Sequence, residues 1–444
     1  MMDNFTDTIV ASATPPGVGG VGIVRLSGKL TESIARNILG TLPEPRMATY
    51  KSFRDKSGQR IDSGLVLYFP APLSFTGESV LEIQGHGGPY LQTLIIDTIL
   101  DLGARYAKPG EFSQRAFLNG KLDLVQAESI SDLINAGTNQ AARAAFRSLT
   151  GVFSNYIDVL SNKLLKLRIH IEAAIDFPEE EINFLSDKLL LNRIADCEEV
   201  FSDLLKKTEQ GTLLRDGFQV VIIGKPNVGK SSLLNFLSEQ DSAIVTEVAG
   251  TTRDILRERI NIDGLTVELI DTAGLRDNPE IVEAEGIRRA HKVMKTADAL
   301  IIVEDITDPN SALNANQIPS GLPTIHVQNK LDLCKVKPKA IENHIQISAT
   351  TGEGIKQLRH QIRMIAGYEN QGEGAFTARK RHIQSLKQAA SHFYNGKKVF
   401  YEKHAGELLA EELRLSHQAL GEIVGTVSSD DLLGHIFSDF CIGK

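Results

Sequence analysis

The chain has 444 residues, of which 42% are hydrophobic and 23% charged, a composition typical of a globular protein and not of a disordered or fibrous one. At ~150 residues per domain, this length predicts about three domains. The 56 Asp and Glu residues outnumber the 48 Lys and Arg residues and give a net charge of −8, so any nucleic acid must meet a local basic patch.

Cysteine usage and the apolar runs exclude several classes of protein. Cys197, Cys334 and Cys441 are too few and too scattered for a disulfide framework or a zinc knuckle. The first residues lack the basic segment and the apolar run of a secretory signal. No apolar stretch reaches the ~20 residues that cross a bilayer. We therefore expect a cytoplasmic protein in a reducing compartment, with no membrane contact.

Residues 1–120 predict an α+β domain, because short apolar runs alternate with helical stretches and with loops rich in glycine and proline. Strands are expected at residues 8–11, 21–26, 65–69 and 80–83. Helices are expected at about 31–39, 89–102 and 111–119. The loop at 17–22 fits G-x-G-x-x-G, but a strand and not a helix is expected after it, so we predict no dinucleotide site there.

The apolar residues between about 122 and 210 follow a helical period. One helix face carries a single apolar stripe, formed by Phe153, Tyr156, Leu160, Leu164, Leu167, Ile171 and Ala174. This stripe favours a bundle helix over a coiled coil, and we expect the helix to end before Pro178. The helical pattern returns after a polar, glycine-rich stretch at 370–374. We therefore predict one discontinuous helical domain, residues 121–216 and 369–444, into which residues 217–368 are inserted.

Residues 217–368 predict a Ras-like α/β domain with a mostly parallel sheet. Within them, residues 224–231 match the phosphate loop G-x-x-x-x-G-K-S in full, between an apolar strand and a helical run. The backbone N–H groups of such a loop surround phosphate oxygens. We expect Lys230 to contact the β- and γ-phosphates and the Ser231 hydroxyl to ligate Mg²⁺. The other residues expected at the phosphates are Asn227, Val228, Gly229 and Ser232.

Three further motifs indicate that the nucleotide is GTP. They are Asp271-Thr272-Ala273-Gly274, then Asn329 and Lys330 with Asp332, then Ser348-Ala349-Thr350. The Asp332 carboxylate can accept hydrogen bonds from guanine N1–H and the 2-amino group, which adenine does not offer. All three motifs follow expected strands, and ligands of open α/β sheets bind beyond the carboxyl ends of the strands.

The chain departs from Ras-type GTPases at one position. Leu275 stands where those proteins place a glutamine that positions the attacking water, and a leucine cannot do so. Another group must therefore orient the water. The stretch 246–254 is expected to be a switch-like loop with a threonine ligand to Mg²⁺.

The chain as a whole resembles the MnmE (TrmE) family of tRNA wobble-uridine modification GTPases. The motifs that carry this resemblance lie at 13–17 with 20–23, 74–78, 84–89, 108–113, 173–178, 250–254 and the ending Phe-Cys-Ile-Gly-Lys at 440–444. The resemblance implies a folate-binding N-terminal domain, a helical domain and an inserted G domain, in agreement with the three regions above.

The resemblance also implies a catalytic arrangement. It implies a homodimer whose G domains meet across the nucleotide when K⁺ is bound, with the ion offsetting negative charge that an arginine offsets elsewhere. The ligands of K⁺ would be Asn227 and the carbonyls of Thr246, Val248 and Thr251. The ligands of Mg²⁺ would be Ser231 and Thr252. Glu283 would orient the attacking water, and Arg276 would position that region. From its sequence alone, Glu283 is an ordinary solvated carboxylate on a helix.

Finally, the resemblance implies a one-carbon donor and a partner. The donor would be 5-formyl- or 5,10-methylene-tetrahydrofolate, held by Arg25, Glu82, Lys121 and Lys444. The partner would be the FAD-dependent protein MnmG (GidA), and the product an aminomethyl or carboxymethylaminomethyl group on C5 of tRNA wobble uridine. Cys441 matches a cysteine needed for this process; by itself it is an ordinary thiol, and its match to a C-a-a-X lipidation signal is poor.

Two other classes of GTPase carry comparable loops. A ribosome-assembly GTPase of the Era or Der kind predicts an RNA-binding KH module or a second phosphate loop, and neither is evident in the sequence. A dynamin-like assembly GTPase predicts a basic amphipathic helix or an anchor, which is also not evident. The features outside residues 217–368 therefore favour the tRNA-modifying class.

Overall fold

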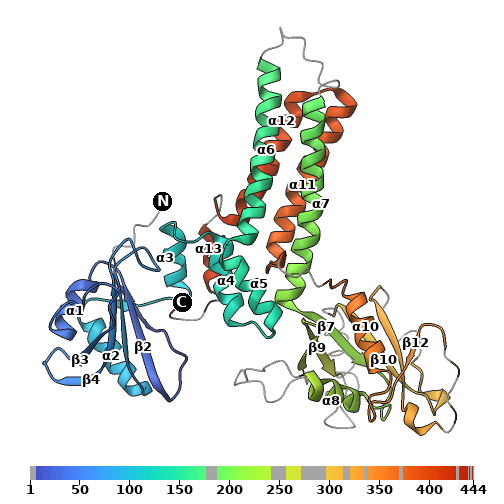
Figure 1. The fold of residues 1–444 in the computed structure, drawn as a ribbon, viewed down its shortest axis with the longest axis horizontal. Coiled ribbons are helices and arrows are strands. Elements are labelled where there is room, and N and C mark those ends of the chain that lie inside the picture. The colour runs from blue at the N-terminus through green and yellow to red at the C-terminus, as the bar shows by residue number, and fades with distance from the viewer. Residues whose placement is uncertain are drawn as a thin grey trace.

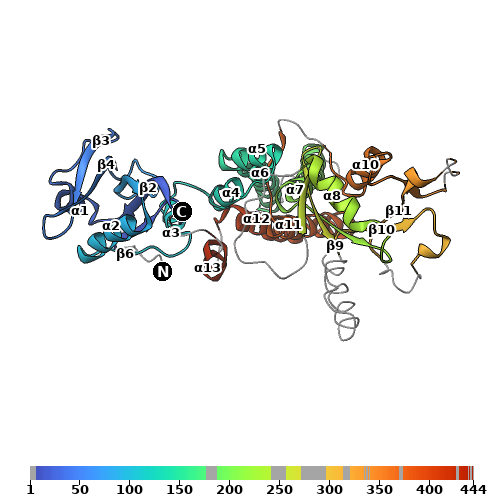
Figure 2. The same cartoon turned by 90° about the horizontal axis from the view of Figure 1, so that it is seen from below.

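The structure is a computed structural model of the chain. It describes residues 7–176, 188–241, 257–271, 297–313, 321–334, 336, 339, 341–369, 374–426, 430–438, 440 and 443. Figures 1 and 2 show a column of long helices that stands between an N-terminal α+β unit and an α/β unit. The predicted fold class is confirmed: an α+β N-terminal unit, an all-α unit and an α/β unit with a phosphate loop.

The N-terminal unit contains a six-stranded sheet with the order β3-β4-β5-β2-β1-β6. Its strands are β1 (Ile9–Ser12), β2 (Gly19–Ser27), β3 (Thr49–Arg54), β4 (Arg60–Phe69), β5 (Val80–Gly87) and β6 (Arg105–Tyr106), and its helices are α1 (Thr31–Leu39), α2 (Pro89–Asp101) and α3 (Glu111–Leu118). Alternate residues of β2 and β5 pack under α1 and α2, including Leu26 and Ile83. The G-x-G-x-x-G stretch at 17–22 runs into β2, which begins at Gly19, so a strand and not a helix lies there, as predicted.

The helical unit is built from two separate stretches of chain. Its helices are α4 (Leu124–Ile134), α5 (Asn139–Leu149), α6 (Val152–Asp176), α7 (Lys188–Asp216), α11 (Lys380–Lys403), α12 (Gly406–Val424) and α13 (Asp430–Ser438). The predicted stripe on α6 is buried, with Tyr156 only partly so, and most of it shares one core with α7, α11 and α12. α6 is therefore a bundle helix. Pro178, its predicted end, lies outside the described residues.

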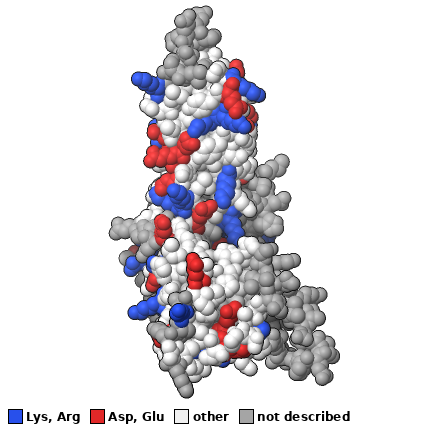
Figure 3. All heavy atoms as spheres, turned by 90° about the vertical axis from the view of Figure 1, so that its right-hand side faces the viewer, with Lys and Arg blue, Asp and Glu red and all other residues white. Residues whose placement is uncertain are grey.

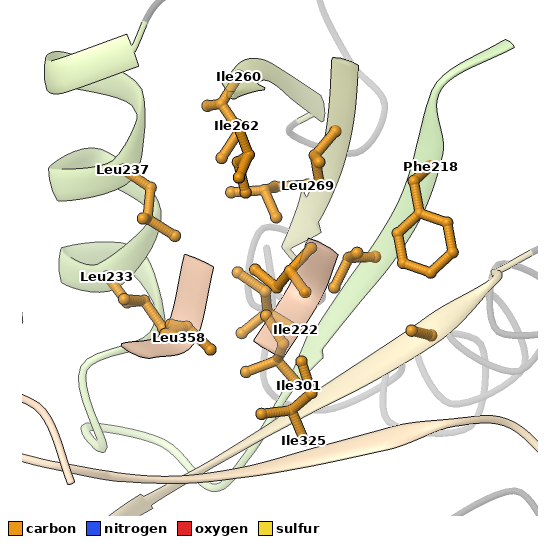
Figure 4. Close-up of a cluster of buried hydrophobic side chains, with 14 of the residues drawn as sticks. Phe218, Ile222, Leu233, Leu237, Ile260, Ile262, Leu269, Ile301, Ile325 and Leu358 are labelled. Atoms are coloured by element: carbon orange, nitrogen blue, oxygen red, sulfur yellow. The ribbon is translucent and has the colours of Figure 1, made fainter. Parts of the chain in front are cut away.

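The α/β unit has a six-stranded sheet with the order β12-β11-β10-β7-β9-β8, parallel except for the β8–β9 hairpin. Its elements are β7 (Phe218–Ile223), α8 (Lys230–Asp241), β8 (Arg257–Ile262), β9 (Leu265–Asp271), β10 (Ala299–Asp305), η3 (Pro309–Ser311), β11 (Thr324–Asn329), η5 (Leu331–Leu333), β12 (His344–Gln346) and α10 (Ile355–Ile365). Figure 4 shows Leu233 and Leu237 of α8 facing Ile222 and Ile301 of the central strands. Burial on both faces explains the continuous apolar run of β10.

The C-terminal segment returns to the N-terminal unit. Phe437 and Phe440 share an apolar cluster with Leu124 of α4. A Cβ on Gly443 would lie 2.2 Å from the Ser12 carbonyl oxygen, so the backbones touch there and only glycine fits. Gly443 is thus held against the end of β1.

The surface and the helices add two observations. On the face that Figure 3 shows, lysine and arginine side chains are interspersed with aspartate and glutamate. In the described ranges, no helix is both long and apolar enough to cross a membrane.

Candidate functional site: a nucleotide site and a second charged cluster

The phosphate loop connects β7 to α8. Asn227 and Gly229 both have left-handed backbone, with φ of +64° and +94°. A Cβ on Gly229 would lie 2.2 Å from Asn329 Nδ2, so glycine is required at this position. Lys230, the first residue of α8, is buried, and its ammonium group donates to the Lys225 carbonyl at 2.9 Å. The loop therefore curls around a lysine at a helix N-terminus, a setting that suits phosphate oxygens.

Asn329 ties three loops together at the end of β11. Its side chain is buried; Nδ2 donates to the Val228 carbonyl at 3.0 Å and Oδ1 accepts from the Ala349 N–H at 3.0 Å. One amide thus joins the phosphate loop to two loops that are more than one hundred residues further along the chain. Replacement by a residue without both groups would leave buried backbone partners unsatisfied.

Asp332 is oriented by Ser348. It lies in η5, where its Oδ1 accepts from the Ser348 hydroxyl at 2.6 Å, and its side chain is exposed. The hydroxyl of Ser348 is buried and also accepts from the Thr351 N–H at 3.1 Å. A carboxylate fixed in this way is suited to accept two N–H groups from the edge of a base. Ala349 and the exposed Thr350 follow directly, as the sequence predicts.

The motifs reach the same edge of the sheet. Asp271 is the last residue of β9 and pairs with Ile222 of β7, directly before the phosphate loop. The carboxyl ends of β7, β9, β11 and β12 thus carry the loops that the sequence predicts at a nucleotide. Exposed Ser231 and Ser232 follow Lys230 in the first turn of α8. Outside the described residues lie Thr246, Val248, Thr251, Thr252, Thr272, Ala273, Gly274, Arg276, Glu283, Cys441 and Lys444.

A second cluster, on the sheet of the N-terminal unit, contains two of the predicted folate residues. Arg25 and Glu82 are partners across β2 and β5, with Nε and Nη2 of Arg25 at 2.9 and 2.8 Å from Glu82 Oε1. Arg25 Nη1 also donates to the carbonyl of Gly443, next to Lys444, at 3.4 Å. Lys121 is exposed and packs beside Gly77, in the 74–78 loop. Arg25, Glu82 and Gly443 therefore meet.

Comparison with known proteins covers the whole chain. The family model for the GTP-binding protein TrmE N-terminus matches residues 8–121, and that for the MnmE helical domain matches residues 124–441. The chain belongs to the MnmE (TrmE) family. Proteins called tRNA modification GTPase MnmE are 50% identical over 450 residues in Coxiella burnetii, 51% over 451 in Pseudomonas syringae and 52% over 458 in Yersinia pestis, each alignment covering 99% of both chains.

The MnmE match extends beyond the nucleotide-binding unit, which favours this family over the ribosome-assembly and dynamin-like classes. Among solved structures, the G domain of the T. maritima FeoB iron transporter is 26% identical and covers 34% of this chain and 98% of its own. Its TM-score of 0.27 is too low to carry a conclusion.

Some residues of the MnmE motifs have contacts that the sequence does not predict. Phe75 and Phe112 lie with their ring centroids 5.9 and 5.8 Å from the Arg25 guanidinium carbon. Both belong to motifs of the resemblance, 74–78 and 108–113, which is the signal that could have found them. Arg115 is fully buried and pairs with Asp7 and with two acids of these motifs, Glu78 and Glu111, so carboxylates neutralise a buried cation.

Of the cysteines, Cys197 is buried in the helical core. Burial raises the pKa of its thiol to about 11, so it is protonated and unreactive at neutral pH. Cys334 is partly exposed. Cys441, the cysteine that the resemblance singles out, lies outside the described residues.

Proposed function

We propose that this chain is a K⁺-activated GTPase that acts in the cytoplasm with an FAD-dependent partner of the MnmG (GidA) kind. Together they would add an aminomethyl or carboxymethylaminomethyl group to C5 of tRNA wobble uridine, with a tetrahydrofolate derivative as one-carbon donor. The coarser statement follows from the family: the chain is a tRNA modification GTPase. The observation that carries the nucleotide assignment is the set of contacts joining Asn329, Ala349, Asp332 and Ser348.

Guanine recognition rests on Asp332. Its carboxylate is held through one oxygen by Ser348 and is otherwise exposed, so it can receive guanine N1–H and the 2-amino group. Adenine presents an acceptor at N1 and would leave the carboxylate unpaired at the base edge. Asn329 and Lys330 belong to the same loop as Asp332. The bond from Asn329 to the Val228 carbonyl would fix the distance between this loop and the phosphate loop.

Phosphate binding rests on Lys230 and the N-terminus of α8. Lys230 donates to a carbonyl of its own loop, and a phosphate oxygen at the loop centre is a better acceptor for this ammonium group. The exposed Ser231 hydroxyl in the first turn is an oxygen ligand that suits Mg²⁺. Ser231 and Thr252 would hold this ion, which neutralises charge on the β- and γ-phosphates.

The hydrolytic step needs charge compensation and a positioned water. Asn227 is exposed and has a left-handed backbone within the phosphate loop, which fits an amide oxygen offered to a monovalent cation. With carbonyls of Thr246, Val248 and Thr251, it would hold K⁺ where two copies of the chain meet. Glu283 would orient the attacking water, a role that Leu275 cannot fill, and Arg276 would position Glu283.

The folate donor fits the cluster around Glu82. The Nε and Nη2 groups of Arg25 both contact Glu82 Oε1, and among the described residues no donor reaches Oε2. That oxygen can accept from the 2-amino-pyrimidinone edge of a pterin. Lys121 and Lys444 would attract the glutamate tail of the donor, and Cys441 would act in the modification chemistry.

The test is mass spectrometry of tRNA nucleosides from cells that lack this protein. We expect wobble uridine to lose its C5 substituent, and the wild-type gene to restore it. A gene encoding Glu82→Gln is expected to restore it poorly while the encoded protein still hydrolyses GTP, because the two sites lie in different units. Unchanged wobble uridine in the deletion strain would overturn the proposed function.

A further inference from the structure

The turn that follows β10, residues 305–311, contacts both nucleotide-binding loops. Lys330 of the loop predicted to bind guanine, residues 329–332 and called here the guanine loop, donates from Nζ to Asp305 Oδ2 at 2.6 Å. Lys225 of the phosphate loop donates to the carbonyl of Asn310. Two lysines, one from each loop, are thus fixed by one short segment that belongs to neither loop.

This turn, called here the β10 turn, is closed by its own hydrogen bonds. The buried Ser311 hydroxyl accepts from the Asp305 N–H at 3.0 Å and lies 2.7 Å from the Asp308 carbonyl oxygen. Asp305 Oδ1 accepts from the N–H and the hydroxyl of Thr307 at 2.9 and 2.6 Å. One oxygen of Asp305 is therefore held by the turn, and the other is presented to Lys330.

The partner of Asp305 is a residue in a restricted conformation. Lys330 has φ of +71°, in the left-handed region that residues with a Cβ rarely adopt. Its neighbour Asn329 pairs with Asp305 across β11 and β10, and the Ile306 N–H donates to the Asn329 carbonyl at 3.0 Å. The β10 turn therefore holds the guanine loop at two points, the carbonyl of Asn329 and the ammonium group of Lys330. Both points lie where the chain turns toward Asp332.

Asp305 is ionised in this setting. Burial alone would raise the pKa of its carboxyl, but the hydrogen bonds from Lys330 and Thr307 outweigh burial and keep the pKa below its usual value. The side chains of Asp305 and Lys330 are 13% and 29% exposed, so the pair is partly shielded from water. A charge-assisted bond of 2.6 Å in such a place holds a flexible lysine better than a fully exposed pair would.

We propose that Asp305 is a positioning residue for guanine nucleotide: its carboxylate holds Lys330, and with it the guanine loop, in the binding conformation before the nucleotide arrives. The inference rests on the proposed nucleotide site. It assigns Asp305 no contact with the nucleotide and no part in hydrolysis. Pre-organisation of this kind raises affinity because the ordering of the loop is complete before binding.

The test is a double-mutant cycle on the full chain, with a fluorescent GDP analogue as the probe. We expect Asp305→Asn to weaken GDP binding ~5- to 10-fold, with kcat at saturating GTP unchanged and KM raised. Lys330→Met should weaken binding at least as much, and the double variant no more than the weaker-binding single variant, because both changes break one interaction. Asp263→Asn, which removes a carboxylate paired with Arg363 elsewhere in the same unit, is the control and should bind GDP like wild type.

The outcomes separate this inference from the proposed function. Wild-type affinity in Asp305→Asn would overturn the inference alone, as would losses that simply add in the double variant. A fall in kcat without a change in KM would also contradict it, because Asp305 would then act on hydrolysis and not on binding. A wild-type chain that binds no GDP would overturn the nucleotide site and this inference with it.

Discussion

A buried ion cluster joins the helical unit to both connections that lead into the nucleotide-binding unit. On α4, Glu128 accepts from Arg381 at 2.8 Å through both oxygens, and Asp132 accepts from Arg215 and Arg379 at 2.9 and 2.8 Å. Arg215 lies at the end of α7, directly before β7, and the other two arginines lie at the start of α11. α4 therefore holds the two ends of the inserted unit together.

We predict that Glu128→Gln destabilises the chain strongly. Glu128 is 1% exposed, and its replacement keeps the shape but leaves Arg381 without its counter-charge. Breaking a buried ion pair by removal of one partner costs roughly 3–5 kcal/mol. The lower end of this energy range applies, because Arg381 is 18% exposed and also donates to the carbonyls of Glu422 and Ile423. About 3 kcal/mol corresponds to a fall in melting temperature of roughly 6–12 °C for a unit of this size.

The assay is thermal unfolding at pH 7 followed by circular dichroism at a helical wavelength. Glu199→Gln, an exposed carboxylate on α7, is the matched control and should change the midpoint by less than about 2 °C. Equal midpoints for Glu128→Gln and Glu199→Gln would refute the reasoning, because they would mean that the Arg381–Glu128 bonds do not contribute to stability.

Three further predictions concern acid stability and the nucleotide loops. Burial, assisted by Arg381, lowers the pKa of His382 from 6.5 to about 4. As the pH falls, the unfolded chain therefore takes up a proton at a higher pH than the folded chain does. Wild type should lose about 2 kcal/mol of unfolding free energy between pH 7 and pH 5, and His382→Gln should lose less, as measured by melting curves at the two pH values. Gly229→Ala should displace Asn329 and weaken GDP binding by about 30-fold or more in a fluorescence titration, whereas Gly58→Ala should not change it. Asp332→Asn should weaken GTP binding and bind xanthosine triphosphate relatively better in competition assays; an unchanged preference would place the base site elsewhere.

Local patterns were sufficient to predict much of the fold. The stripe on α6 and the apolar run of β10 follow from side-chain period and burial, which depend on near neighbours in the chain. The phosphate loop was equally predictable, because the glycines, the lysine and the serine that define it lie within eight consecutive residues, 224–231. The placement of the later motifs at one sheet edge followed from parallel topology.

The remaining features depend on contacts between distant residues. Glu128 and Arg381 are 253 positions apart, and each by itself is an ordinary charged residue of a helix. Arg25 and Glu82 were expected at one site only from the family resemblance, and their ion pair was not predicted, since alternating charges on strands usually face solvent. Asp305 was missed for the same reason: its partner Lys330 lies on a neighbouring strand end, and no spacing rule connects them.

The central claim is that a monovalent cation at Asn227 supplies the positive charge for GTP hydrolysis. The most direct measurement is GTP turnover by the purified chain in KCl and in NaCl at equal ionic strength, for wild type and Asn227→Ala. We predict faster turnover in K⁺ for wild type and no difference between the salts for Asn227→Ala. Equal wild-type rates in the two salts would contradict the account.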